Sequence, residues 1–258
     1  MGDAMISYVI PTYYREHLLR PQLEAFQYQT DKDFEIIVTD DGAANCEGLR
    51  LSQKHGASYV WNPRGEKYWL SRTVNAGLRV AKGDWLVILT NGCVPSRNMT
   101  SAVPLMDRNT LYTATINALD ERDYRGTMTN DLLAQWEIRP RVDPRWRGFN
   151  ADGNGGLCWV GEGRGQDARR IRNFWLAGVA MHRSLYERLG PLDESYIGYG
   201  CEDGAYAASA VRKGAQIGYA LMFMVHHLYH PPHASLTEPH PDQMANFAKL
   251  TKEFPGIW

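Results

Sequence analysis

Short apolar runs alternate with helical stretches through the first part of the chain, and this alternation constrains the fold more than any other feature. The apolar runs predict strands at residues 6–10, 34–38, 57–61 and 85–89. Helical periodicity predicts helices between them, at residues 17–29, 46–54 and 70–81. Strands that alternate with helices form a parallel sheet covered on both faces. The sequence therefore predicts an α/β fold with a mostly parallel central sheet.

Composition excludes several classes of protein. The 258 residues fit one large domain or two small ones, and a net charge of −1 gives no overall attraction to nucleic acid or to an anionic membrane surface. No run approaches the roughly 18 apolar residues of a membrane span, and the first five residues lack the pattern of a signal peptide. The four cysteines form no CxxC pair, so a zinc site of cysteines is not expected. Reduced thiols and a cytoplasmic location are the expectation.

The regular pattern weakens after Asp120. Residues 120–172 are rich in Gly, Arg and Trp and show little periodicity, which indicates a long, partly irregular insertion. Beyond the insertion, the sequence predicts strands at residues 173–182 and 217–225 and helices at residues 183–189, 204–213 and 242–253.

Two acidic loops are the candidate functional positions. Asp40, Asp41 and Gly42 follow the second predicted strand, and a carboxylate at the end of a parallel strand lies where α/β sheets bind nucleotides. Glu202 and Asp203 open a predicted helix after a glycine-containing loop, where a mobile segment can close over a substrate. An Asx turn and a helix N-cap are the purely structural alternatives. Together the loops indicate an enzyme that binds a nucleotide with one loop and performs acid–base chemistry with the other.

Motifs along the chain resemble the family 2 glycosyltransferases of the GT-A fold. In the first half they read VIPTYYR at residues 9–15, IIVTDDGA at 36–43, NAG at 75–77 and AKGDW at 81–85. In the second half they read AG at 177–178, LGPLDE at 189–194 and GCED at 200–203. This second group also resembles the C-terminal module of β-1,4-galactosyltransferase-like enzymes. The resemblance covers residues 6–95 and 174–218 and omits the insertion.

The resemblance implies one GT-A domain over residues 1–258, with a nucleotide-sugar-binding half at 1–118 and an acceptor-binding half at 119–258. It implies transfer of a sugar from a nucleotide-sugar, expected to be a UDP-sugar, to an acceptor hydroxyl with inversion at the anomeric carbon. Family members usually hold a divalent metal, Mn²⁺ or Mg²⁺, with an acidic motif after the fourth strand. Here that position reads Thr90, Asn91 and Gly92, which lack the charged oxygens that such ions prefer. Other ligands then hold the metal, cationic side chains replace it, or activity is lost.

The resemblance also assigns the donor contacts. Asp40 is expected to accept the N3–H of uracil, and Asp41 to form the turn. Arg64, Lys67 and Arg72 lie where cationic side chains would meet the diphosphate, although a solvated charged loop is the alternative for each alone. The remaining expected donor contacts are Pro11, Thr12, Tyr13, Arg15, Asn91 and Gly92.

The second acidic loop is expected to carry the chemistry. Asp203 matches the family's catalytic base, which takes a proton from the acceptor hydroxyl, and Glu202 is expected to orient the acceptor. Two adjacent carboxylates raise each other's pKa, which suits a base that works near neutrality. The expected acceptor contacts are Trp175, Gly178 and Tyr199.

Five histidines follow the last predicted strand. In related enzymes one histidine of this segment ligates the metal, so His227 or His226 is the candidate here. Imidazole suits Mn²⁺ better than Mg²⁺. The alternatives are a protonated histidine that meets the diphosphate directly and a surface loop stiffened by Pro231 and Pro232.

The insertion bears on the acceptor, because arginines there are interleaved with tryptophans. Tryptophan stacks on sugar faces and on unpaired bases, and arginine binds phosphate. A saccharide acceptor is the first expectation, a hydroxylated base in DNA is the alternative, and an arginine-rich packing segment is the structural interpretation. A nucleotide-sugar-binding protein without catalysis is the non-enzyme alternative. A nucleotidyltransferase is disfavoured because residues 11–15 are not a glycine-rich basic loop.

Overall fold

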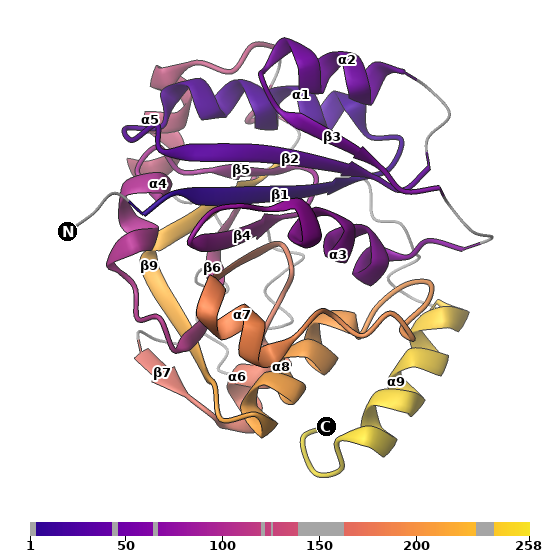
Figure 1. Ribbon diagram of the computed structural model, residues 1–258. Helices are drawn as coiled ribbons and strands as arrows, with labels where there is room; N and C mark the ends of the chain where they lie inside the picture. Colours follow the sequence, from indigo (N-terminus) through magenta and orange to yellow (C-terminus); the bar gives the residue numbers. More distant parts are fainter. Residues whose placement is uncertain are drawn as a thin grey trace.

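A single mixed sheet forms the centre of the molecule. The computed structural model describes residues 4–42, 46–63, 67–119, 122–124, 126–138, 163–230 and 240–258. Within these residues the sheet has nine strands in the order β3-β2-β1-β4-β8-β6-β9-β5, with β7 paired to β9. Helices cover both of its faces, as Figure 1 shows. The predicted α/β architecture is confirmed.

The first half of the sheet is parallel, as the apolar runs predict. It contains β1 (Ile6–Thr12), β2 (Phe34–Asp40), β3 (Ser58–Trp61) and β4 (Trp85–Leu89). β2 pairs with β3, and β1 lies between β2 and β4. In this register Asp40 lies opposite both Thr12 and Trp61. The three strands therefore end together, and the loops that follow them meet at one edge of the sheet.

Helices of the first half pack on opposite faces of these strands. α1 (Glu16–Ala25), the 3-10 turn η1 (Phe26–Tyr28) and α2 (Glu47–Lys54) lie on one face, and α3 (Leu70–Val80) lies on the other (Figure 1). Because strand side chains alternate, Tyr8 packs in the cluster with α1 and α2, whereas Val9 packs in the cluster with α3. A Cβ atom on Gly77 would lie 2.8 Å from Thr39 Cγ2, so only glycine allows α3 this close to the sheet.

The second half of the sheet is mixed, which corrects the expectation of a mostly parallel sheet. It contains β5 (Cys93–Pro95), β6 (Thr110–Ala118), β7 (Gly163–Gly165), β8 (Gly178–His182) and β9 (Gln216–His227). β8 is antiparallel to β4 and β6, β5 and β7 are antiparallel to β9, and β6 is parallel to β9. β6 lacks an apolar run, because its buried side chains include Thr110, Thr113, Thr115 and Asn117. The apolar pattern therefore did not predict this strand, although threonine, tyrosine and isoleucine favour strands.

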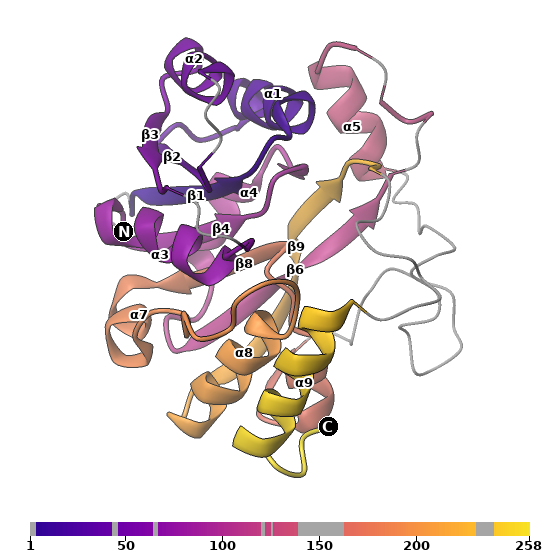
Figure 2. The same cartoon turned by 90° about the vertical axis from the view of Figure 1, so that its right-hand side faces the viewer.

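The remaining helices complete the layers. They are α4 (Met99–Ala102), the 3-10 turn η2 (Val103–Leu105), α5 (Asn130–Ile138), α6 (Ala168–Arg172), α7 (Arg183–Leu189), α8 (Glu202–Arg212) and α9 (Pro241–Glu253). α5, β7 and α6 lie inside the segment expected to be irregular, whose residues 139–162 lie outside the described part. The strand expected at 173–182 begins only at Gly178. α8 and α9 lie side by side in Figure 2.

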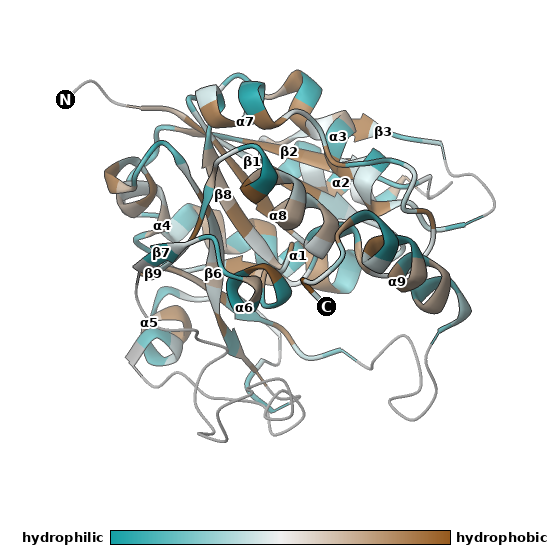
Figure 3. Cartoon of the chain, turned by 90° about the horizontal axis from the view of Figure 1, so that it is seen from below, coloured by the Kyte–Doolittle hydropathy of each residue, from teal (hydrophilic) through white to brown (hydrophobic). Residues whose placement is uncertain are grey.

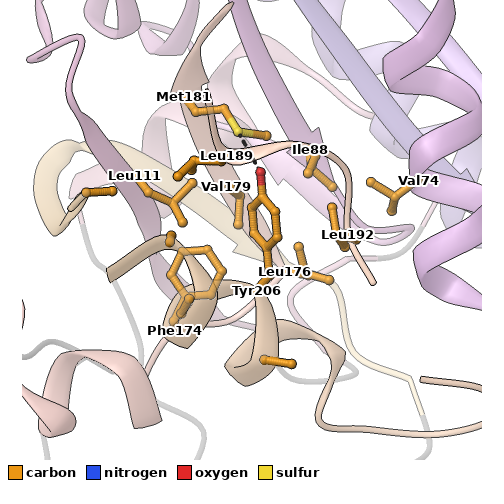
Figure 4. Packing of buried hydrophobic residues seen from close by; sticks show 14 of the residues in the cluster. Val74, Ile88, Leu111, Phe174, Leu176, Val179, Met181, Leu189, Leu192 and Tyr206 are labelled. Carbon is orange, nitrogen blue, oxygen red and sulfur yellow. Dashed lines mark hydrogen bonds between the residues drawn. The ribbon is translucent and has the colours of Figure 1, made fainter. Parts of the chain in front are cut away.

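α8 is anchored in the larger apolar cluster, which fixes the position of its N-terminus. The hydroxyl of Tyr206 donates to Sδ of Met181 at 3.4 Å and to the carbonyl oxygen of Gly190 at 3.2 Å, with Val179 and Leu176 alongside in Figure 4. Burying one large apolar side chain contributes about 1.5–3 kcal/mol. Figure 3 shows the hydrophobic strands of the interior and hydrophilic residues on α7 and α9.

Candidate functional site

Asp40 ends β2 with an almost fully buried carboxylate. The hydroxyl of Tyr59 on β3 donates a hydrogen bond of 2.7 Å to Asp40 Oδ2. A Cβ atom on Gly48 of α2 would lie 3.1 Å from the same oxygen. This oxygen therefore points to the α2 face of the sheet. The expected contact between Asp40 and uracil stays a prediction.

Asp41 does more than form the expected turn. Its carboxylate is also buried, and Oδ2 accepts a hydrogen bond of 3.2 Å from the backbone N–H of Trp69. Burial raises the pKa of Asp41 to about 6, although the Trp69 amide and the charge of Arg72 act in the opposite direction. Gly42 follows with a left-handed φ of 86°. Asp41 thus joins the end of β2 to the segment before α3.

That segment, residues 67–69, connects the two acidic loops. The carbonyl oxygen of Tyr68 accepts a hydrogen bond of 2.8 Å from the amide of Gly198, and Trp69 Nε1 donates to the carbonyl oxygen of Glu194 at 2.7 Å. Burial raises the pKa of the Tyr68 phenol, and the carboxylates of Glu202 and Asp41 raise it further. One phenol therefore lies within electrostatic reach of both loops, which open on a common region.

Glu202 and Asp203 form the first turn of α8, where carboxylates face the positive end of the helix. Asp203 Oδ1 accepts a hydrogen bond of 2.7 Å from the amide of Gly204. Burial raises the pKa of both carboxyl groups, and the charge of Asp203 raises that of Glu202 further. The preceding residue, Cys201, has a left-handed φ of 73°. Such backbone strain in a non-glycine residue is common beside functional groups. The raised pKa values of Glu202 and Asp203 suit these two carboxyl groups to acid–base chemistry.

Asn246 of α9 holds the loop that leads to this pair. Asn246 is 7% exposed, and its side-chain amide donates to the carbonyl oxygens of Ile197 at 3.1 Å and Gly200 at 3.0 Å. Sequence reasoning missed this residue because the contact spans 46 positions. The sequence did hold one signal: Asn246 lies one helical turn before Leu250, so a polar residue falls on the apolar, buried face of the predicted helix.

Asn91 connects the turn after β4 to the loop after β1. Its side-chain Nδ2 donates to the hydroxyl of Thr12 and to the carbonyl oxygen of Arg15, the latter at 3.3 Å. Its Oδ1 is buried, and no described residue forms a hydrogen bond with it. Gly92 follows with a φ of 93° and donates its amide to Gln22 Oε1 at 3.1 Å. The expected donor residues Thr12, Arg15, Asn91 and Gly92 are thus brought together.

The loop after β1 faces the same region. Pro11 is buried within β1 opposite Thr39, and the rings of Tyr13 and Tyr68 lie 6.5 Å apart. Tyr14 has a positive φ of 46°, and among the described residues only Tyr14 and Cys201 share this strain without being glycine. Both strained residues lie in loops of the candidate site.

Two of the expected cationic contacts have other partners or lie elsewhere. Lys67 Nζ forms an ion pair of 2.6 Å with Asp242 of α9. Arg72 donates to the carbonyl oxygen of Pro63 at 3.3 Å, and its guanidinium lies 5.2 Å from the ring centre of Trp69. Arg64 lies outside the described residues. Among the described residues, Arg15 has Tyr68, Cys93 and Tyr199 as electrostatic neighbours, which places it near the region between the loops.

The described residues do not form a carboxylate-based metal site. They contain no group of three or more His, Cys, Asp and Glu side chains arranged for a metal. His226 is fully buried, Nδ1 contacts the side chain of Asn117 at 2.9 Å, and burial lowers its pKa to about 3. His227 lies opposite Cys93 on β5, beside the turn at 90–92, and its ring is 5.1 Å from that of His230. Imidazole and amide groups alone fit a hard divalent cation poorly.

The three expected acceptor residues differ in their surroundings. Gly178 lies within β8, where a Cβ atom would be 3.1 Å from Val225 Cγ1, so close packing accounts for this glycine. Trp175 is partly buried, and its carbonyl oxygen accepts a hydrogen bond of 3.0 Å from Thr113. Tyr199 is 42% exposed and stands two residues before Cys201. Of the three, Tyr199 alone combines exposure with a place in the loop that leads to Glu202 and Asp203.

The fold matches that of known glycosyltransferases. PcManGT, a mannosyltransferase of Pyrobaculum calidifontis solved with GDP-Man and Mn²⁺, has a TM-score of 0.55 at 16% identity, over 91% of this chain and 59% of that one. GalNAc-T7, solved with UDP, GalNAc and Mn²⁺, has a TM-score of 0.62 at 18% identity, over 97% of this chain and 48% of that one. S. aureus TarS, residues 1–349, has a TM-score of 0.61 at 13% identity, over 87% of this chain and 60% of that one. At these identities the likeness concerns the fold.

Sequence comparison identifies the family. A Haemophilus influenzae protein described as an uncharacterized glycosyltransferase is 27% identical over 106 residues, which are 41% of this chain and 35% of that protein. The chain thus spans only part of the length of its relatives. None of the described helices is both long enough and apolar enough to span a membrane. Residues 7–161 match the model of glycosyl transferase family 2. The chain therefore belongs to glycosyl transferase family 2.

Proposed function

We propose that this glycosyltransferase moves a sugar from a UDP-sugar to an acceptor hydroxyl and inverts the anomeric carbon. The observation that carries this proposal is the segment at residues 67–69, which joins the two loops: the amide of Trp69 donates to Asp41 Oδ2 at 3.2 Å, and the carbonyl oxygen of Tyr68 accepts from the amide of Gly198 at 2.8 Å. A strand-end turn that suits a nucleotide thus lies near a carboxylate pair that suits proton transfer. The nucleotides bound in the structures of PcManGT and GalNAc-T7 support a nucleotide-sugar donor.

The nucleotide is proposed to bind over the edge where β1, β2 and β3 end. Thr12 and Tyr13 would contact the nucleoside from the loop after β1. The carboxylate that accepts the N3–H of uracil comes from the turn of Asp40 and Asp41. Exchange of each aspartate for asparagine, with uridine affinity as the readout, identifies which one reads the base.

Asp203 is proposed as the base. Its carboxylate takes the proton of the acceptor hydroxyl, the hydroxyl oxygen forms a bond to the anomeric carbon, and the bond from that carbon to the diphosphate oxygen breaks. UDP leaves with the electron pair. A raised pKa makes the carboxylate a stronger proton acceptor while it stays largely ionised near neutrality. Glu202 is proposed to orient the acceptor.

The acceptor is proposed to be a saccharide that stacks on Tyr199. This ring is partly exposed and lies beside the carboxylate pair. Partial burial raises the pKa of its phenol most, and the charges of Glu202 and Asp203 raise it further. Aromatic rings offer apolar surface and a polar edge, which suit sugars. A hydroxylated base in DNA is the alternative acceptor, and its support lies in the arginines and aromatic side chains of residues 136–172, of which 139–162 lie outside the described part.

A panel of nucleotide-sugars tests the proposal. A ligand that binds only the native protein raises its Tm, so UDP-sugars are expected to raise it and free sugars are not. The best donor is then assayed for release of UDP with and without an acceptor panel. A protein that binds no nucleotide-sugar in this panel would refute the proposal.

A nucleotide-sugar-binding protein without catalysis is the second candidate. The segment at 90–92 favours it, because an amide stands where the family usually carries carboxylates. It predicts a raised Tm with UDP-sugars and no release of UDP, either in EDTA or in Mn²⁺. Measurable turnover that disappears in Asp203→Asn would exclude this candidate.

A further inference from the structure

Arg15 is a partly buried cation for which the described residues provide no anionic partner. It occupies the N-cap of α1, directly after the loop that follows β1. No hydrogen bond or ion pair engages its guanidinium among the residues that the structure describes. Arg97 provides the contrast, because its partly buried guanidinium pairs with Glu137 at 2.9 Å. A buried charge without a partner is costly, which indicates that Arg15 binds an anion supplied from outside the chain.

The position of Arg15 defines where that anion lies. Its electrostatic neighbours are Tyr68, Cys93 and Tyr199. Cys93 follows the turn at 90–92, and Tyr199 belongs to the catalytic loop. Tyr68 lies between the two acidic loops. Arg15 thus stands between the nucleotide edge and the carboxylate pair, where the diphosphate of a bound donor would pass.

The turn at 90–92 supports Arg15 in this role. Asn91 Nδ2 donates to the carbonyl oxygen of Arg15, and a carbonyl oxygen can only accept, so an amide nitrogen must face it. An aspartate at this position would place a carboxylate oxygen against that carbonyl oxygen. The residue that replaces the usual metal-binding carboxylate therefore holds the loop of the arginine, and its chemistry suits that contact.

We propose that the guanidinium of Arg15 neutralises the donor diphosphate directly, in place of a divalent cation held by carboxylates. This inference rests on the proposed nucleotide-sugar donor. Arginine presents two parallel N–H groups to phosphate oxygens and stays charged at every physiological pH. The same contact stabilises the negative charge that builds on the diphosphate as the sugar leaves. The ligand class is therefore a nucleoside diphosphate bound without a metal.

Calorimetric titration with UDP and with uridine separates the diphosphate contact from the base contact. In EDTA the wild-type protein is expected to bind UDP at least about tenfold more tightly than uridine, since hydrogen bonds to charged groups are strong. Arg15→Gln should lower UDP affinity to that of uridine and leave uridine affinity unchanged. Arg15→Lys should recover part of the difference, because lysine keeps the charge but loses the paired N–H groups. GDP and guanosine are titrated in parallel, so that a different base preference is recognised.

Arg20→Gln is the matched control. Arg20 lies on the exposed side of the same helix, in an ion pair with Glu47, and its exchange should leave both affinities unchanged. A preference for UDP over uridine that appears only with Mn²⁺, or that persists in Arg15→Gln, would overturn the inference. The wild-type titration in EDTA shows whether the preference for UDP requires a metal, even where a variant fails to fold. Absence of binding by either nucleotide would instead refute the proposed donor.

Discussion

The side-chain amide of Asn246 donates a hydrogen bond of 3.0 Å to the carbonyl oxygen of Gly200. Gly200 lies two residues before Glu202, so α9 fixes the backbone from which the carboxylate pair projects. On the other side, the amide of Gly198 donates to the carbonyl oxygen of Tyr68 at 2.8 Å. The loop at residues 198–201, which carries the proposed catalytic pair, is therefore held between the segment before α3 and a helix close to the end of the chain.

Exchange of Asn246 for alanine is expected to impair both stability and turnover. The carbonyl oxygens of Ile197 and Gly200 lose a buried donor, which costs about 1–3 kcal/mol of unfolding free energy. Without the hydrogen bonds of Asn246, the loop should adopt positions in which Asp203 is misaligned. We therefore expect kcat to fall more than donor affinity. Urea unfolding and UDP release measure the two effects. Lys252→Ala, at an exposed position of α9, is the control that should change neither.

Asp203→Asn is expected to separate binding from chemistry. Asparagine keeps the size of the side chain and an oxygen for the amide of Gly204, but it cannot take a proton. Turnover should fall by about 10²–10⁴-fold, the usual contribution of a general base, while UDP affinity stays near that of the wild type. Glu202→Gln should be milder and act on acceptor KM. Equal losses in the two variants would contradict the assignment of the base to Asp203.

The fold was predictable where the sequence has a single interpretation. Strands β1, β2 and β4 contain apolar runs that are almost entirely buried, a pattern typical of a sheet covered on both faces. β6 is buried with threonines and an asparagine, so its pairing with β8 and β9 became visible only in three dimensions.

The site was predictable as a pair of loops, but its details were not. The different contacts of Asp40 and Asp41 depend on Tyr59 and on the amide of Trp69, which lie on separate segments. Neighbouring residues of a strand point to opposite faces, so the sequence could not say which aspartate meets which partner. Asn246 belongs to no recognisable motif. Its contacts with the loop could not be predicted, because they depend on where α9 packs.

Burial of Asp41 predicts a stability that depends on pH. In the unfolded chain this carboxyl releases its proton near pH 4, whereas in the folded protein its pKa is about 6. Between these values the folded protein binds more protons, so this group's contribution to stability falls as pH rises from 4 to 6 and is constant above 6. The change is at most about 1.4 kcal/mol per pH unit. Asp41→Asn should remove it.

The measurement is the difference in unfolding free energy between Asp41→Asn and the wild type at each pH. A difference is required because buried His226, with a lowered pKa, titrates in the opposite sense over the same range. The stability of Asp41→Asn relative to the wild type should increase between pH 4 and pH 6 and then level off. Asp131→Asn, the same exchange at an exposed position of α5, is the control. A flat difference for Asp41→Asn would show that its carboxylate is not desolvated.

Gly198→Ala tests whether the catalytic loop depends on its contact with α9. Gly198 has a φ of 83°, and a Cβ atom there would lie 2.7 Å from Cβ of Asp242. Gly214 has a similar φ of 80° with no atom within 4 Å of an added Cβ, so Gly214→Ala measures the backbone strain alone, about 1–2 kcal/mol. Gly198→Ala should cost more than this in urea unfolding and should also slow UDP release, because α9 must move and the contacts of Asn246 loosen. In an Asp242→Ala background, the excess cost of Gly198→Ala over Gly214→Ala should shrink. Equal costs for the two glycine variants, with turnover unchanged, would show that the loop and the helix are not mechanically connected.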